Sequence, residues 1–155
     1  MAKNVIRQIR KNTRRRFSAD EKIRIVDDRA VSPGEDADDQ LRAVIDNLLP
    51  SDPDADKTRI RTAMLQLRAQ TPYDPAFREQ FGKNDRAIHD MLAAHVSAGI
   101  DQGVYRDADP DEVAEFIHAT INGAILRGVT LGDQDANPAI RAGIDDYLDG
   151  LRRDE

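Results

Sequence analysis

Three proline-marked starts divide the second half of the chain into segments with helical periodicity. Asp74-Pro75, Asp109-Pro110 and Asn137-Pro138 each place a capping side chain before a proline at the first helical position, where a missing N–H costs nothing. Apolar residues follow each start at spacings of three and four. No stretch alternates with period two for long enough to make a convincing strand. The sequence therefore predicts an all-α fold.

The expected architecture is an antiparallel bundle of about five helices within residues 40–155. The expected helices cover residues 41–49, 55–70, 74–102, 110–131 and 138–151. Gly82 and Asn84 are expected to bend or break the third helix near residue 83, and Gly103 and Gly132 are expected to follow helix ends. The fourth helix is apolar on most sides, which predicts burial all round.

Charge divides the chain between Val26 and Asp27. Residues 1–26 hold nine Lys or Arg against two acids, whereas residues 27–155 hold 14 positive and 27 negative side chains. We therefore expect a basic N-terminal segment (1–26), an acidic linker rich in turn residues (27–39) and a helical body (40–155). An acidic body repels nucleic acid, so DNA contact is expected only through the basic segment, at Lys11, Arg14, Arg15 and Arg16, or through a partner.

Several functional classes find no support in the sequence. There is no cysteine, so disulfides and thiolate zinc sites are excluded. No apolar run approaches the roughly 20 residues that a membrane span needs, and the expected location is the cytoplasm. No nucleophile elbow, phosphate-binding glycine loop or HExxH motif is present, so we expect neither an enzyme nor a cofactor.

An ordered set of phrases between residues 74 and 151 resembles the C-terminal regulatory domain of TetR-family transcriptional regulators. These phrases are Asp74-Pro-Ala-Phe77, Ala98-Gly-Ile-Asp-Gln-Gly-Val-Tyr-Arg106, Asp109-Pro-Asp-Glu-Val-Ala114 and Ile121-Asn-Gly-Ala124. Towards the N-terminus, the resemblance extends to about residue 38. It implies a ligand-sensing and dimerising domain, whose last two helices form a four-helix bundle with a second subunit.

Carried over to this chain, the resemblance implies a homodimer interface on the last two helices and a pocket for a small apolar ligand. The expected interface residues are Phe116, Thr120, Gly123, Ala124, Arg127, Ile144, Tyr147, Leu148 and Leu151. The pocket residues to consider first are Met64, Leu67, Met91, His95, His118 and Asn122. For His95 and His118, a core or interface role stands beside the ligand-binding one.

The N-terminal segment does not match that family. Residues 7–26 (RQIRKNTRRRFSADEKIRIV) resemble the opening of transposase helix-turn-helix proteins, and Ser18 with Glu21 forms a capping box that opens a helix over Glu21–Val26. Neither family's recognition helix follows, so a complete helix-turn-helix is not expected. The alternative interpretation is a transposase-derived remnant with weak, non-specific DNA binding through its basic segment.

Acidic clusters and histidines give little indication of a metal site. Turns such as Asp52-Pro-Asp-Ala-Asp56 lack the glycine and the terminal glutamate of a calcium loop. His89 has Asp85 and Asp90 nearby, but no third ligand has convincing spacing. We expect no metal ion.

Overall fold

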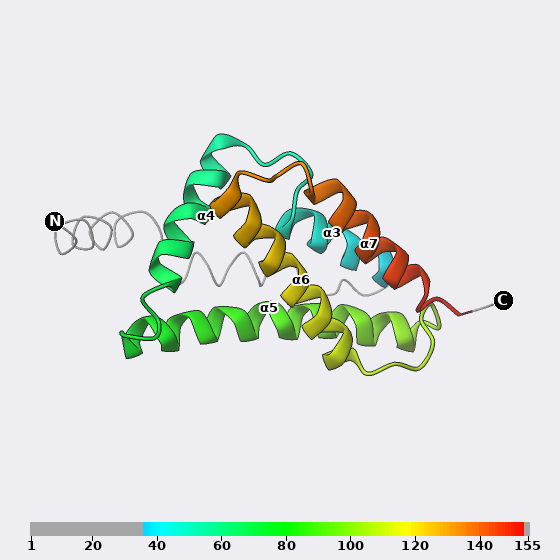
Figure 1. The fold of residues 1–155 in the computed structure, drawn as a ribbon. Coiled ribbons are helices and arrows are strands. Elements are labelled where there is room, and N and C mark those ends of the chain that lie inside the picture. Colours follow the sequence, from blue (N-terminus) through cyan, green and yellow to red (C-terminus); the bar gives the residue numbers. More distant parts are fainter. Residues whose placement is uncertain (1–35, 154–155) are drawn as a thin grey trace, which may run out of the picture. The chain divides into compact units, whose positions relative to one another are not determined.

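The structure, a computed structural model, describes residues 36–153. The capping box at Ser18, the expected helix over 21–26 and the four basic residues expected to contact DNA lie outside this range. Five helices follow one another in the described part: α3 (Ala37–Leu48), α4 (Ala55–Arg68), α5 (Pro75–Asp101), α6 (Pro110–Leu131) and α7 (Asn137–Asp149) (Figure 1). The all-α prediction is confirmed.

Acidic side chains start four of the five helices, because their oxygens satisfy backbone N–H groups that have no partner within the helix. Asp54 accepts from the N–H of Lys57 at 2.7 Å, and Asp74 and Asp109 do the same for the residues that follow their prolines. Asp36 caps α3, so this helix begins inside the segment that composition assigns to an acidic linker. Gly132 ends α6 at φ +67°, as predicted from its position.

The core lies where α5 crosses α6 on one side and α3 on the other (Figure 1). Besides Tyr105, large and fully buried apolar side chains come from these helices, from α7 and from the residue that follows α3: Leu41, Ile45, Leu49, Leu92, Ile117, Ile144 and Leu148. A short antiparallel bridge between Tyr105 and Arg152 joins the α5–α6 loop to the segment after α7. Arg106 N–H donates to the Leu151 carbonyl at 2.8 Å, and Arg153 N–H donates to the Val104 carbonyl at 3.0 Å.

Two expectations about individual helices are wrong. The third helix is continuous through Gly82 and Asn84, because a single glycine costs a helix only about 1 kcal/mol and the helix has 27 residues. The fourth helix is not buried all round: within the chain, α6 hides only one face, while Phe116 and Leu126 are each 47% exposed. On α4, Ile60 is also 47% exposed.

Candidate functional site

Five of the six residues expected in a ligand pocket lie inside the helical body. Leu67, Met91, His95 and His118 are buried, and Met64 is half-buried. Asn122 is exposed, because its position on α6 lies outside the face that packs on the rest of the chain. His95 is satisfied within its own helix, where its Nδ1 lies 2.8 Å from the Met91 carbonyl oxygen. That contact favours the core role for His95.

His118 differs from His95 in leaving a polar atom without a partner. Its side chain is 7% exposed, and its Nε2 makes no hydrogen bond to any group in residues 36–153. Desolvation lowers the pKa of His118, although the nearby carboxylates of Asp85 and Glu115 act in the opposite direction. The imidazole is therefore neutral at physiological pH, with one nitrogen that can accept a hydrogen bond.

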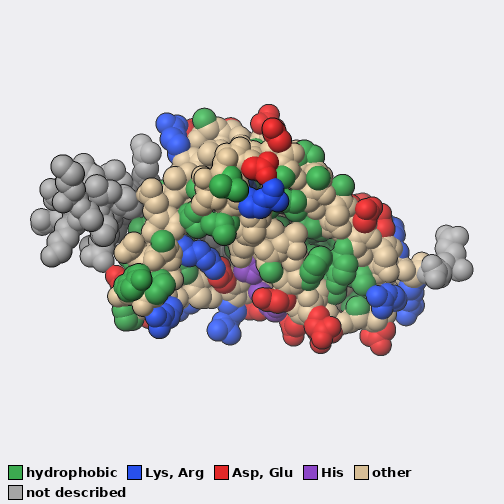
Figure 2. All heavy atoms as spheres, in the orientation of Figure 1, with side chains coloured by type: hydrophobic (Ala, Val, Ile, Leu, Met, Phe, Trp, Pro, Cys, Tyr) green, Lys and Arg blue, Asp and Glu red, His purple; other side chains and the backbone are tan. Residues whose placement is uncertain are grey.

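An ion pair stands beside His118 and connects α4 to α5. The guanidinium of Arg68, at the end of α4, binds both carboxylate oxygens of Asp85, with one contact at 3.0 Å. The same guanidinium lies 5.4 Å from the centre of the Phe81 ring. Figure 2 shows histidine side chains near the middle of one face of the molecule, between α4 and α6, with cationic and anionic side chains beside them.

The seam between α4 and α6 also contains a small cavity. Its volume is about 10 Å³, which is room for about one water molecule. The lining residues are Thr58, Arg61, Ala124, Ile125, Gly128, Val129, Gln134 and Asn137. None of the six residues predicted for the pocket lines it. Asn137 donates from Nδ2 to the Pro50 carbonyl at 3.3 Å, and its buried Oδ1 has no partner among the described residues.

A second surface of interest is the outward face of α6 together with α7. The rings of Phe116 and Tyr147 stack with centroids 4.5 Å apart and planes tilted by 44°. Gly123 lies two turns along the same side of α6, and a methyl group added to it would touch nothing within 4 Å. Figure 2 shows hydrophobic side chains gathered in the area where α6 and α7 lie.

The residues predicted for the dimer interface divide into two groups. Phe116, Gly123 and Arg127 are exposed, and Thr120 and Tyr147 are half-buried, so these five lie on the outward face. The remaining four belong to the core of this one chain: Ala124, Ile144, Leu148 and Leu151 are each 4% exposed or less. The helical stripe of α7 therefore packs against its own chain, and the apolar pattern alone cannot distinguish that from a contact with a partner.

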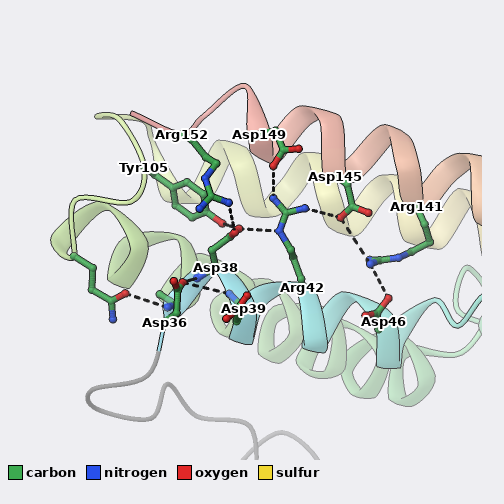
Figure 3. Close-up of polar contacts among 12 residues, drawn as sticks. Asp36, Asp38, Asp39, Arg42, Asp46, Tyr105, Arg141, Asp145, Asp149 and Arg152 are labelled. Carbon is green, nitrogen blue, oxygen red and sulfur yellow. Dashed lines mark hydrogen bonds and ion pairs between the residues drawn. The ribbon is translucent and has the colours of Figure 1, made fainter. Parts of the chain in front are cut away.

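A buried polar cluster centred on Asp38 was not predicted from the sequence. Its carboxylate is 3% exposed and accepts from the Tyr105 hydroxyl at 2.5 Å, from Arg152 at 2.8 Å and from Arg42 Nε at 3.0 Å (Figure 3). Burial raises the pKa of Tyr105, and the adjacent Asp38 raises it further, so the phenol remains a donor. The cluster fixes the start of α3 to the α5–α6 loop and to the segment after α7.

The cluster continues along the contact between α3 and α7 as a row of ion pairs. Arg42 also reaches Asp145 at 2.9 Å and Asp149 at 2.6 Å, and Arg141 binds Asp46 at 2.6 Å (Figure 3). Each of these carboxylates is at least one-third exposed, so the row contributes less to stability than its length suggests. It does fix how α7 is aligned with α3.

Comparisons with known proteins identify this arrangement. The family model described as the C-terminal domain of BetI-type transcriptional repressors matches residues 37–153, from the first residue of α3 to the end of the described part. The chain belongs to this TetR-type repressor family. A crystal structure of a TetR transcription regulator from Haloarcula marismortui ATCC 43049 is 29% identical to it, with a TM-score of 0.74. The alignment covers 86% of this chain and 69% of that one. The curated proteins gave no match.

The region around His118 and the outward face of α6 and α7 both lie within the range that the family model matches. The matched range includes all five helices, the Asp38 cluster, His118 and the outward face of α6. Within residues 36–153, no helix is long and apolar enough to cross a membrane. In the same range, no three His, Asp or Glu side chains are grouped so that they could hold a metal ion.

Proposed function

We propose that this chain is the ligand-sensing and dimerisation part of a transcriptional regulator that acts in the cytoplasm as a homodimer. Regulators of the TetR family generally act as dimers. The observation that carries the proposal is the uncovered face of α6 and α7, where Phe116, Gly123 and Tyr147 meet solvent in the single chain. A second copy would cover this face by a four-helix contact.

Gly123 supports this interpretation independently of the aromatic pair. Glycine inside a helix costs roughly 0.5–1 kcal/mol relative to alanine. Nothing in residues 36–153 requires glycine there, since an added methyl group would meet no atom of these residues within 4 Å. Gly143, on α7, is likewise exposed and open. Close approach of a helix from a partner would give both positions a reason to lack a side chain.

The test is the solution mass of the full chain, measured by light scattering coupled to gel filtration. The wild type should have twice the monomer mass of 17.3 kDa, and Phe116→Asp should shift it to the monomer by burying a charge in the interface. Ile60→Asp is the matched control, because Ile60 has the same 47% exposure on α4. A monomeric wild type, or dimers that survive Phe116→Asp as well as the control, would contradict the proposal.

DNA binding, if the protein has it, is expected only through the N-terminal segment or a partner. Lys11, Arg14, Arg15 and Arg16 lie outside the described residues, so both direct DNA binding through them and the transposase-derived alternative stay predictions. Residues 27–155 carry 27 acidic against 14 basic side chains, which disfavours phosphate binding by this part of the chain.

A further inference from the structure

We propose that one water molecule is bound where α4, α6 and the start of α7 meet, and that it bridges the Arg61 guanidinium to the side-chain oxygen of Asn137. The proposal goes beyond the sensing and dimerisation function and does not depend on it. The site combines a cavity of about 10 Å³ with a buried acceptor that has no partner in residues 36–153. It also contains a cation that no carboxylate in this range pairs with.

Asn137 supplies the acceptor. Its side chain is 2% exposed, and its Nδ2 donates to the Pro50 carbonyl at 3.3 Å. That contact fixes the orientation of the amide, because a swapped amide would point its oxygen at the Pro50 oxygen. Oδ1 is therefore the atom that is buried without a hydrogen bond to the described residues. Folded proteins pair most such atoms, either with protein groups or with ordered water.

Arg61, on α4, supplies the donor. Its Nη2 donates to the Leu48 carbonyl at 2.7 Å, two residues before the carbonyl that holds Asn137. The two side chains thus bind the same short stretch of backbone at the end of α3, and both line the cavity. Desolvation lowers the pKa of Arg61, and no carboxylate among residues 36–153 offsets it. A guanidinium carries several N–H donors, so Arg61 retains donors for a molecule in the cavity.

The size and the polar groups of the cavity select water. A bound water needs roughly 10 Å³ or more of space and roughly two to four polar partners. Two further polar side chains, Thr58 and Gln134, line the cavity beside Arg61 and Asn137. An anion would meet the lone pairs of Asn137 Oδ1, and a cation would meet the Arg61 guanidinium. Water avoids both conflicts, because it accepts from Arg61 and donates to Oδ1.

The bridge matters most for the first half of α4. Of the 14 residues of this helix only Leu67, near its C-terminal end, is buried. Polar contacts therefore carry more of the attachment at the other end, where Arg61 binds the Leu48 carbonyl and Gln134 Nε2 donates to Thr58 Oγ1 at 3.3 Å. The bound water adds a third contact there. Without it, this half of the helix should open more often.

The experiment detects the water itself, by nuclear Overhauser effects in the full-length chain. Ile125 and Val129 line the cavity, and their methyl protons do not exchange with solvent. We expect these methyl groups to show cross-peaks with the sign of a water that stays longer than the protein takes to tumble. Because exchange of the Thr58 hydroxyl proton can also transfer magnetisation, the measurement is repeated on Thr58→Val. The cross-peaks should persist in that variant.

Two glycine variants test whether the water holds α4. Gly128 lines the cavity, and a β-carbon added there would stand 3.4 Å from Gln134 Cγ. Gly128→Ala should therefore displace the water and remove the cross-peaks. Amide exchange in the first half of α4 should become about tenfold faster, the effect of losing roughly one hydrogen bond. Gly82→Ala is the matched control, since it adds a methyl group to a helix where nothing lies within 4 Å. It should change neither readout.

Three results would overturn the proposal. The first is a wild type whose Ile125 and Val129 methyl groups show no cross-peak to long-lived water. The second is a set of cross-peaks that disappears in Thr58→Val. The third is a Gly128→Ala protein that matches Gly82→Ala in cross-peaks or in the exchange of α4. If Gly128→Ala does not fold, the wild type and Thr58→Val still decide whether the water is bound.

Discussion

At the scale of single residues, Gly99 has no room for a side chain. A β-carbon added there would lie 2.4 Å from Cδ2 of Tyr105, whose ring is fully buried against the helix. Gly99→Ala should therefore destabilise the domain by roughly 1–3 kcal/mol through overpacking. Gly82→Ala, in the same helix with nothing within 4 Å, should instead stabilise it by roughly 0.5–1 kcal/mol. Urea unfolding of both variants checks the pair, and effects of the same sign would contradict it.

His118 gives a second prediction at the residue scale, on pH dependence. Its pKa in the folded state is lowered from 6.5 by burial, so the unfolded chain binds this proton more readily. Stability from this group is complete above about pH 6.5 and is lost as pH falls below it, with a slope of at most about 1.4 kcal/mol per pH unit. His118→Gln should flatten the plot of unfolding free energy between about pH 6.5 and 5.5. Parallel plots for the two proteins would refute this assignment.

At the scale of helices, the starts and ends could be predicted from neighbouring residues, whereas the face that each helix buries could not. The starts at Asp74 and Asp109 and the end at Gly132 follow from a few neighbouring residues, so the sequence indicates them directly. Gly82 was misjudged because the helix penalty of a single glycine is only about 1 kcal/mol, which a helix of 27 residues tolerates. The two faces of α6 are both apolar, so periodicity could not tell which one the chain itself covers.

The candidate site could also be predicted only in part, because its contacts join residues that are far apart in the sequence. His118 could be singled out as a histidine inside an apolar helix, but its unpaired nitrogen depends on which side chains of α4 and α5 stand nearby. Asp38 was missed because it lies in an acid-rich stretch that resembles a solvated linker. Its partners Tyr105 and Arg152 are 67 and 114 residues away. Such pairing is decided by the assembled fold, and no local pattern encodes it.

At the scale of the whole molecule, net charge should control assembly. The full chain has a formal net charge of −6, and residues 27–155 alone carry 13 more negative than positive side chains, so two copies that meet through α6 and α7 repel each other. Salt screens this repulsion, because the Debye length falls from about 10 Å at 0.1 M salt to about 3 Å at 1 M. The apolar contact of Phe116 and Tyr147 is not weakened by salt. The dimer should therefore tighten as salt rises.

Sedimentation equilibrium at 0.05, 0.2 and 1 M NaCl measures this directly. We expect the dissociation constant to fall several-fold across the series, and to fall less in a variant in which exposed acids near the face, such as Glu112 and Asp146, are replaced by Gln and Asn. A dimer that weakens with salt would instead mean that ion pairs involving groups such as Arg127 hold the two copies together. In that case Arg127→Gln, rather than Phe116→Asp, would be the substitution that separates them.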